Sequence, residues 1–399
     1  MGAEEERPSG DSIGNGAVTF LRHDPMKRHR ILHIRDSSGI FGSERVIMTL
    51  GKNLNPDLFD LSLLCMRRND GRSEPLIGLA RSMGVEVEPV DVKGRIDLKA
   101  VVRIRQFIQS HNVSLIHTHD FKSDFYGLLA TWKLGVRRVA TAHGSTRDSL
   151  LKKLYLYADE NAVYRLYDKI IAVSEGIHTE LSGKSEMRGR VELIQNGLDA
   201  GLLNAHGNGS DPPLPVSKSP GKTIFAVVGR LFPDKGHKVF LHAFAGLASE
   251  APGSFGIIAG DGPEKESILR AVHTLGIRGK MFYCGVRKNI KDLYRNIDCL
   301  VIPSFTEGLP YVMLEAMSCG IPVIATSVGD IPLLIQDNIT GYLIPPGDVG
   351  ALTLRMRDIA SRPEHARAMA DEGRNLVNRK FSAGLMVKKT EALYLSLLS

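Results

Sequence analysis

Cysteine is scarce in this chain, and the four cysteines among its 399 residues show no paired spacing. That scarcity argues against a disulfide framework and a cysteine-based zinc site, and it predicts a reduced, cytoplasmic protein. Long apolar runs are also lacking, since none approaches the roughly 20 residues that cross a bilayer. Residues 1–29 have no apolar core of a secretion signal, and we predict that they form a flexible leader.

Negative charge is in deficit: the net charge is +7 at pH 7 and the isoelectric point is about 9.1. Aromatic residues do not interleave with the basic ones, which argues against a nucleic-acid partner. Two interpretations of the charge stay open, a solvated basic surface or attraction to anionic lipid and phosphorylated substrates. A hydrophobic content of 43% is typical of a globular protein, and the length favours two domains.

What the sequence does contain is a repeated alternation of strand and helix patterns. A buried-strand pattern, RILHIRD, precedes a glycine-containing turn and a helix pattern, and similar units continue to residue 203. A Gly-, Pro- and Ser-rich stretch at 204–222 is typical of a linker. We therefore predict an α/β fold of two doubly wound, Rossmann-like domains, 30–203 and 223–378, facing across a cleft. An amphipathic helix at 379–399 would end the chain.

Two glutamates, Glu307 and Glu315, lie in the stretch SFTEGLPYVMLEAMSCGIPVIAT. Proline is favoured at the start of a helix and glycine after its end, so we predict a helix from Pro310 to Cys319 that Gly320 stops. Glu307 would then lie in the loop before the helix, and Glu315 inside it. A helix N-terminus carries unpaired N–H groups and partial positive charge, which favours a phosphate ligand.

Two cations, Arg230 and Lys235, follow the first strand pattern of the second half in GRLFPDKG. They can converge on one diphosphate, the arginine as a fork and the lysine as a point charge, or they can be solvated cations beside a turn. GDGPE at 260–264 is either a strand-to-helix turn or a ligand contact. CGV at 284–286 could present backbone groups to a flat base.

Together these motifs resemble the family 4 retaining glycosyltransferases, whose two Rossmann-like domains form the arrangement called GT-B. The second half matches through GR with its lysine, GDGPE and the two glutamates; the first half matches more loosely through HTHD, ATAHGS, VSEG and IQNGLD. The resemblance implies that Arg230 and Lys235 bind the donor diphosphate and that the final helix returns to the first domain. Glu307 would hold sugar hydroxyls, and Glu315 the ribose hydroxyls. It also implies donor contacts from Gly42, Val286, Gly308, Leu309, Tyr311 and Val312.

In the first domain, the resemblance implies that His143 faces the donor sugar. His119 and Asp120 would line the acceptor side. His117 and His119 share a face of a predicted strand, which leaves a zinc site or a buried histidine pair as alternatives; we expect no metal. The chain has Phe41 where the family usually has a second glycine.

Two further departures lie in VGDIPLLI, where Asp330 replaces a usual glycine and Leu333 a usual glutamate. Both lie outside the predicted phosphate loop. We expect them to alter packing or acceptor shape rather than to remove activity.

The predicted function is retaining, metal-independent transfer of a sugar from a nucleotide-diphosphate donor, and the family resemblance favours a UDP-sugar as that donor. A glycan or lipid-linked acceptor in cell-surface polysaccharide or glycolipid synthesis would receive the sugar. We predict no cofactor and no nucleic-acid partner. The alternatives are a nucleotide-sugar epimerase or hydrolase on the same fold, and a non-catalytic basic protein that binds lipid or glycan. An amphipathic stretch at 148–169 either touches the inner face of a membrane or packs on its own domain.

Overall fold

The computed structural model describes residues 28–36, 39, 42–67, 70–94, 96–143, 162–199 and 211–399. The predicted leader therefore lies outside the described residues except for its last two positions, and so does Phe41. The same holds for most of the amphipathic stretch and for the first part of the predicted linker. Within the described part, no helix is both long enough and apolar enough to cross a membrane.

The first half of the chain builds a seven-stranded parallel sheet in the order β3-β2-β1-β4-β5-β6-β7. Its strands are β1 (His29–Asp36), β2 (Phe59–Arg67), β3 (Glu86–Asp91), β4 (Leu115–Thr118), β5 (Arg137–Ala142), β6 (Lys169–Ala172) and β7 (Val191–Leu193). Its helices are α1 (Gly42–Asn53), α2 (Glu74–Ser82), α3 (Leu98–Ser110), α4 (Phe121–Ala130) and α6 (Glu175–Ser182). The strand order reverses between β1 and β4, which is the doubly wound arrangement.

The second half builds a six-stranded parallel sheet in the order β10-β9-β8-β11-β12-β13. Its strands are β8 (Thr223–Val228), β9 (Ser254–Ala259), β10 (Met281–Gly285), β11 (Cys299–Ile302), β12 (Val323–Thr326) and β13 (Tyr342–Ile344). Its helices are α7 (His237–Glu250), α8 (Lys265–Thr274), α9 (Ile290–Asn296), α10 (Tyr311–Ser318), α11 (Ile331–Leu334), α12 (Val349–Ser361) and α13 (Pro363–Lys380). The predicted pair of doubly wound sheets is confirmed.

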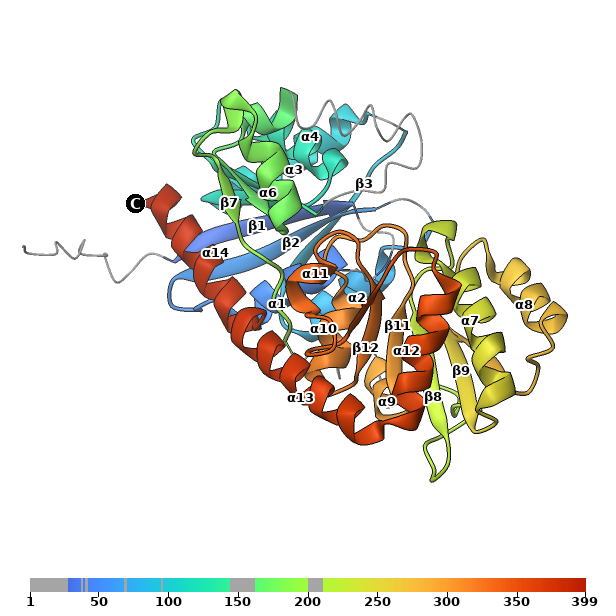
Figure 1. Cartoon of the computed structure of the whole chain (residues 1–399). Helices are drawn as coiled ribbons and strands as arrows, with labels where there is room; N and C mark the ends of the chain where they lie inside the picture. The colour runs from blue at the N-terminus through green and yellow to red at the C-terminus, as the bar shows by residue number, and fades with distance from the viewer. Residues whose placement is uncertain are drawn as a thin grey trace, which may run out of the picture.

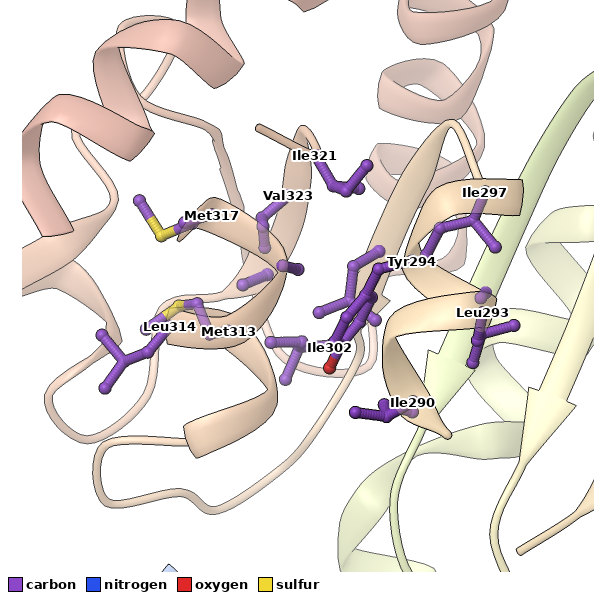
Figure 2. Close-up of a cluster of buried hydrophobic side chains, with 14 of the residues drawn as sticks. Ile290, Leu293, Tyr294, Ile297, Ile302, Met313, Leu314, Met317, Ile321 and Val323 are labelled. Carbon is purple, nitrogen blue, oxygen red and sulfur yellow. The ribbon is translucent and has the colours of Figure 1, made fainter. Parts of the chain in front are cut away.

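Burial on both faces of a parallel sheet explains why its central strands read as apolar runs. Every residue of β11 and β12 is buried. One face is covered by α9 and α10, whose side chains belong to the cluster of Figure 2, where Ile302 of β11 lies between Tyr294 of α9 and Met313 of α10. Tyr294 also lies in this cluster, and its hydroxyl group donates a hydrogen bond to Glu315 of α10.

The last two helices join the halves (Figure 1). Helix α13 packs on α10, and α14 (Ala383–Leu398) returns to pack on α1 and the first sheet. The two chain crossings lie side by side, since the Leu198 N–H donates to the Phe381 carbonyl at 2.8 Å and the Ala383 N–H donates to Leu198 at 3.1 Å. The expected return of the final helix to the first domain is confirmed.

Three details differ from the sequence analysis. Pro310 is the N-cap of α10 with an extended backbone, not its first helical residue, and Cys319 is the C-cap. The short edge strands β7 and β13 were not predicted, because three-residue strands leave almost no periodic signal. The described end of the amphipathic stretch is buried at Val163, Tyr164 and Tyr167, which favours packing on its own domain at that end.

Candidate active site

The two sheets present the carboxyl ends of their strands to each other. The N-terminus of α1, which follows β1, meets the N-terminus of α10, which follows β11. A Cβ on Gly42 would lie 3.1 Å from the Tyr311 ring. The N-terminus of α6, which follows β6, meets Asp330, which follows β12: the Glu175 N–H donates to Asp330 Oδ2 at 3.2 Å. Ligands of open α/β sheets bind at such strand ends, so both halves contribute to one candidate site.

Lys235 and Glu307 meet on the second domain's side of this site. Lys235 Nζ lies 2.8 Å from Glu307 Oε1, and the Ser304 hydroxyl donates to the same oxygen at 2.7 Å. Both charged side chains keep some solvent exposure, 18% and 13%. The arrangement therefore holds a cation and an acceptor of hydrogen bonds at one accessible point.

Two glycines with positive φ bring the loops of this pair into contact. Gly236 has φ 65°, and a Cβ there would overlap the Pro303 carbonyl. Gly329 has φ 54°, and a Cβ there would overlap the Glu307 carbonyl. Only glycine tolerates both the conformation and the close approach. The positions of Lys235 and Glu307 therefore depend on backbone packing rather than on the pair itself.

Arg230 is exposed on the neighbouring loop, with its guanidinium carbon 5.1 Å from the centre of the Phe232 ring. The GDGPE motif supports this loop. The Leu231 N–H donates to the Asp261 carbonyl at 2.9 Å, and the Glu264 N–H donates to the Leu231 carbonyl at 3.0 Å. Because Cβ atoms on its two glycines would overlap the backbone of 229–231, the turn interpretation of GDGPE explains its sequence.

The remaining donor-binding predictions fall on two loops. Gly308 is exposed with open space around its Cα, whereas Leu309 is buried. Tyr311 and Val312 begin α10 and are partly buried. Val286 is 68% exposed directly after β10. Gly308, Leu309, Tyr311 and Val312 lie at the start of α10, whose N-terminal N–H groups the sequence analysis assigned to phosphate.

Glu315 has partners that the sequence did not reveal. Its carboxylate is fully buried, forms an ion pair with Arg45 of α1, and accepts a hydrogen bond from the Tyr294 hydroxyl at 2.8 Å. Burial lowers the pKa of Arg45 and raises that of Tyr294. In this arrangement the carboxylate connects the two domains.

The first domain contributes four histidines. His33, His117 and His119 are at most 2% exposed, and His143 directly follows β5. Burial lowers the pKa of His33 to about 3. Burial, together with the charge of Arg35, lowers the pKa of His143 to about 3. The imidazoles are therefore neutral at pH 7.

His33 is the neighbour that the sequence analysis did not find for His117 and His119. It pairs with His117 across adjacent strands β1 and β4. One nitrogen of each of these three rings lies within 4.8 Å of the others, a spacing compatible with a metal site. The signal was present in RILHIRD, because a histidine inside a buried strand needs a polar partner.

Asp120 has a structural role in addition to its predicted acceptor-side position. It caps α4 by accepting from the Ser123 N–H at 3.0 Å, and it lies 3.2 Å from Arg35 Nη1. Arg35 also donates to the His119 carbonyl at 2.8 Å. The HTHD segment is therefore held rigidly at the end of β4.

Asp330 and Leu333, the two departures in VGDIPLLI, have different surroundings. Asp330 is buried, and besides Glu175 it reaches the backbone N–H of Gly176 and the side chain of Ser174. Burial raises its pKa. Leu333 is 44% exposed. The aspartate thus supplies a contact between the domains, which agrees with the expectation of altered packing.

Two facing Rossmann-like sheets with a returning final helix, a paired lysine and glutamate, and a helix N-terminus define a GT-B glycosyltransferase. Residues 40–202 match the model of glycosyltransferase family 4, and residues 215–376 match that of glycosyl transferases group 1. The chain belongs to this family and uses a nucleotide-sugar donor.

Two relatives with named activities match over most of the chain at low identity. The chain is 26% identical over 310 residues to N-acetyl-alpha-D-glucosaminyl L-malate synthase of Bacillus anthracis, covering 76% of this chain and 80% of the relative. It is 24% identical over 388 residues to UDP-Gal:alpha-D-GlcNAc-diphosphoundecaprenol alpha-1,3-galactosyltransferase of Escherichia coli, covering 92% and 97%. Among solved structures, HepE of Anabaena in complex with UDP and glucose has a TM-score of 0.77 at 20% identity, covering 92% of this chain and 100% of HepE. That likeness shows the fold.

Proposed function

We propose that the protein transfers a sugar from a UDP-sugar to a glycan or lipid-linked acceptor with retention of the anomeric configuration. The observation that carries this proposal is the Lys235–Glu307 pair, 2.8 Å apart beside the N-terminus of α10. One partner can bind phosphate oxygens and the other sugar hydroxyls. A donor bridging them would have its diphosphate and its sugar at adjacent points.

Catalysis of this transfer is mainly electrostatic in the proposal. Negative charge builds on the diphosphate as the bond to the sugar lengthens, and an oxocarbenium-like sugar forms. Lys235, Arg230 and the first N–H groups of α10 would meet that charge. The family resemblance supports attack by the acceptor on the same face of the sugar from which the leaving group departs. The departing phosphate would act as the base. No protein nucleophile is then required.

Glu315 binds the ribose hydroxyls in this proposal, and Arg45 must move away for it to do so. The Arg45 guanidinium forms an ion pair with this carboxylate. We expect UDP to bind more tightly than 2′-deoxy-UDP in the wild type, and the difference to disappear in Glu315→Ala. Calorimetric dissociation constants for both nucleotides would test this. Equal discrimination in the variant would assign Glu315 a purely structural role.

UDP and a lipid-linked acceptor are supported by relatives rather than by a side-chain signature. The Escherichia coli relative is named for UDP-galactose and an acceptor on diphosphoundecaprenol, and HepE was solved with UDP. A net charge of +7 favours anionic surfaces, which is consistent with peripheral action at the inner face of a membrane.

The first experiment is thermal unfolding with UDP, GDP and ADP, on the wild type and Arg230→Ala. A ligand at a hundred times its dissociation constant stabilises by about 2.7 kcal/mol, which raises a melting temperature by a few degrees. We expect UDP alone to raise it, and Arg230→Ala to lose the shift. Arg270→Ala, which changes an exposed arginine on α8, is the matched control. A shift with another nucleotide would reassign the base, and no shift would contradict the diphosphate site.

A second experiment separates transfer from the alternatives. Radiolabelled UDP-sugars are incubated with and without a polyprenyl-diphosphate-linked sugar. Product that appears only with acceptor supports transfer, whereas donor turnover without acceptor supports an epimerase or hydrolase. Vesicle binding without any sugar release would support the non-catalytic alternative.

A further inference from the structure

The buried histidines are joined in one chain of hydrogen bonds that begins inside the first domain. Thr141 Oγ1 lies 2.6 Å from His117 Nε2, and His117 Nδ1 lies 2.6 Å from the hydroxyl oxygen of Tyr394. The same hydroxyl oxygen lies 3.3 Å from His33 Nε2. Tyr394 is fully buried and comes from α14. This series of hydrogen bonds therefore runs from β5 through β4 and the final helix to β1.

From β1 the chain continues to the site. His33 Nδ1 lies 2.8 Å from His119 Nε2, and His119 Nδ1 lies 3.2 Å from His143 Nε2. His143, the last ring, is the only member of the chain that keeps partial exposure. We call the six residues the histidine relay: Thr141, His117, Tyr394, His33, His119 and His143.

Because the rings are neutral, the direction of each hydrogen bond fixes the direction of the next one. A neutral imidazole has one N–H and one bare nitrogen, so a ring that accepts on one side must donate on the other. Within the described residues, the Thr141 hydroxyl has no other hydrogen bond, so its proton finds an acceptor only if it donates to His117. Each following group then donates outward, and His143 accepts at Nε2.

We propose that the histidine relay holds His143 with its proton on Nδ1, so that the ring donates a hydrogen bond to an oxygen of the bound donor sugar. The other five members are positioning residues that act through His143. The inference rests on the proposed function, and it takes from the family resemblance the expectation that His143 faces the donor sugar. Without the relay, the ring would divide between two tautomers, one of which presents a bare nitrogen.

The relay depends on α14, the helix that returns to the first domain. The Tyr394 hydroxyl group connects His117 with His33. Tyr394 lies 277 positions from His117 in the sequence. The tautomer of His143 is therefore set only when α14 has packed onto the sheet.

The test is ring-nitrogen NMR of the full-length protein labelled with ¹⁵N-histidine, which distinguishes protonated from bare nitrogens. His143→Asn assigns the signal of His143. We expect a protonated Nδ1 in the wild type and a mixture of both tautomers in Tyr394→Phe, which removes only the hydroxyl group. Thr141→Val should produce the same mixture. Tyr126→Phe is the matched control, because that buried tyrosine accepts from the Asp97 N–H and lies outside the relay.

Kinetics provide the second measurement. Loss of one oriented hydrogen bond predicts a fall of about tenfold in kcat/KM for the sugar donor in Tyr394→Phe. The dissociation constant of UDP should be unchanged, since the diphosphate lies at Lys235. An equal loss of UDP affinity would mean that the variant acts through general destabilisation, and would overturn the positioning role.

Three results would overturn the relay: a protonated Nε2 on His143 in the wild type, no change of tautomer in Tyr394→Phe, or a stoichiometric metal ion in the purified protein. The last would show that His33, His117 and His119 bind a metal through the nitrogens that the relay needs. The NMR measurement requires no donor, so it can fail or succeed independently of the proposed sugar transfer.

Discussion

On the second domain's side of the site, Lys235 and Glu307 are charged, 2.8 Å apart and in partial contact with solvent. On the first domain's side, His119 and His143 are neutral rings whose pKa values burial depresses, and His119 Nδ1 lies 3.2 Å from His143 Nε2. In the proposed mechanism, the two sides bind the same donor by different physical means. The lysine would offer charge, and the histidine would offer a directed N–H group.

The difference follows from what each side must recognise. A group that stabilises a diphosphate has to stay ionised, so it needs a partner and some water, because full burial of a charge is costly. A group that orients a sugar hydroxyl needs direction only, so burial is acceptable once every nitrogen is hydrogen-bonded. Accordingly, backbone contacts at Gly236 and Gly329 position the charged side, and side-chain hydrogen bonds position the neutral side.

Removing the charge has the largest expected effect. In Lys235→Met, sugar transfer should fall by about a thousandfold in kcat/KM, because one group that stabilises the developing charge is lost. Lys238→Met is the control: Lys238 lies on α7, is 54% exposed and pairs with Glu264. A loss below tenfold in Lys235→Met would contradict the proposed role of the charged side.

The second-largest expected effect comes from changing the close backbone contact between Gly329 and Glu307. Gly329→Ala should lower the free energy of unfolding by about 3 kcal/mol, because the new Cβ overlaps the Glu307 carbonyl at positive φ. Gly308→Ala changes the same region, but its Cβ would meet open space. Denaturant unfolding of both variants checks this. Equal stability would show that the loop relaxes freely.

Acid should destabilise the neutral side. His33 and His143 have pKa values of about 3 in the folded state and about 6.5 when unfolded. Protonation therefore favours unfolding, and stability is lost as the pH falls from 6.5 toward 3. At pH 5 each contributes a loss of about 2 kcal/mol. His33→Gln should flatten the dependence of unfolding free energy on pH. The matched variant for comparison is His242→Gln, at an exposed position of α7.

The smallest expected loss of stability comes from removing the contact between Glu175 of the first domain and Asp330 of the second. Asp330→Ala should cost about 1 kcal/mol of stability and loosen the domains, because the N-terminus of α6 loses its acceptor. Asp348→Ala is the matched control, since Asp348 caps α12 within one domain. Small-angle scattering should show a larger radius of gyration only for Asp330→Ala. An unchanged radius would mean that Glu175 and Asp330 do not hold the domains together.

Local patterns predicted most of the fold and part of the site. The strand and helix alternation, the return of the final helix and the loop position of Glu307 agree with the structure. The family resemblance also assigned Lys235 and Glu307 to one predicted donor site, and their side chains meet although they lie 72 positions apart. Their mutual ion pair was not predicted, because two motifs on separate loops carry no information about distance.

The neighbours of Glu315 and of the histidines were missed for a related reason. Arg45 reads as an ordinary residue of an amphipathic helix, and Tyr394 as an apolar position of another. Neither has a local pattern that names its partner. His33 had a weak signal, a polar residue in a buried strand, but its partner depended on the register between β1 and β4.

By itself, the sequence determined two parallel α/β sheets, the order of their elements and the glycines at which the chain turns. These features depend on side-chain period, capping and backbone conformation, which act over a few residues. Only the tertiary structure decided that Arg45 meets Glu315, that Asp330 meets α6, and that Tyr394 joins two histidines. Such contacts depend on how two sheets and a returning helix pack, and that geometry is set by the whole core.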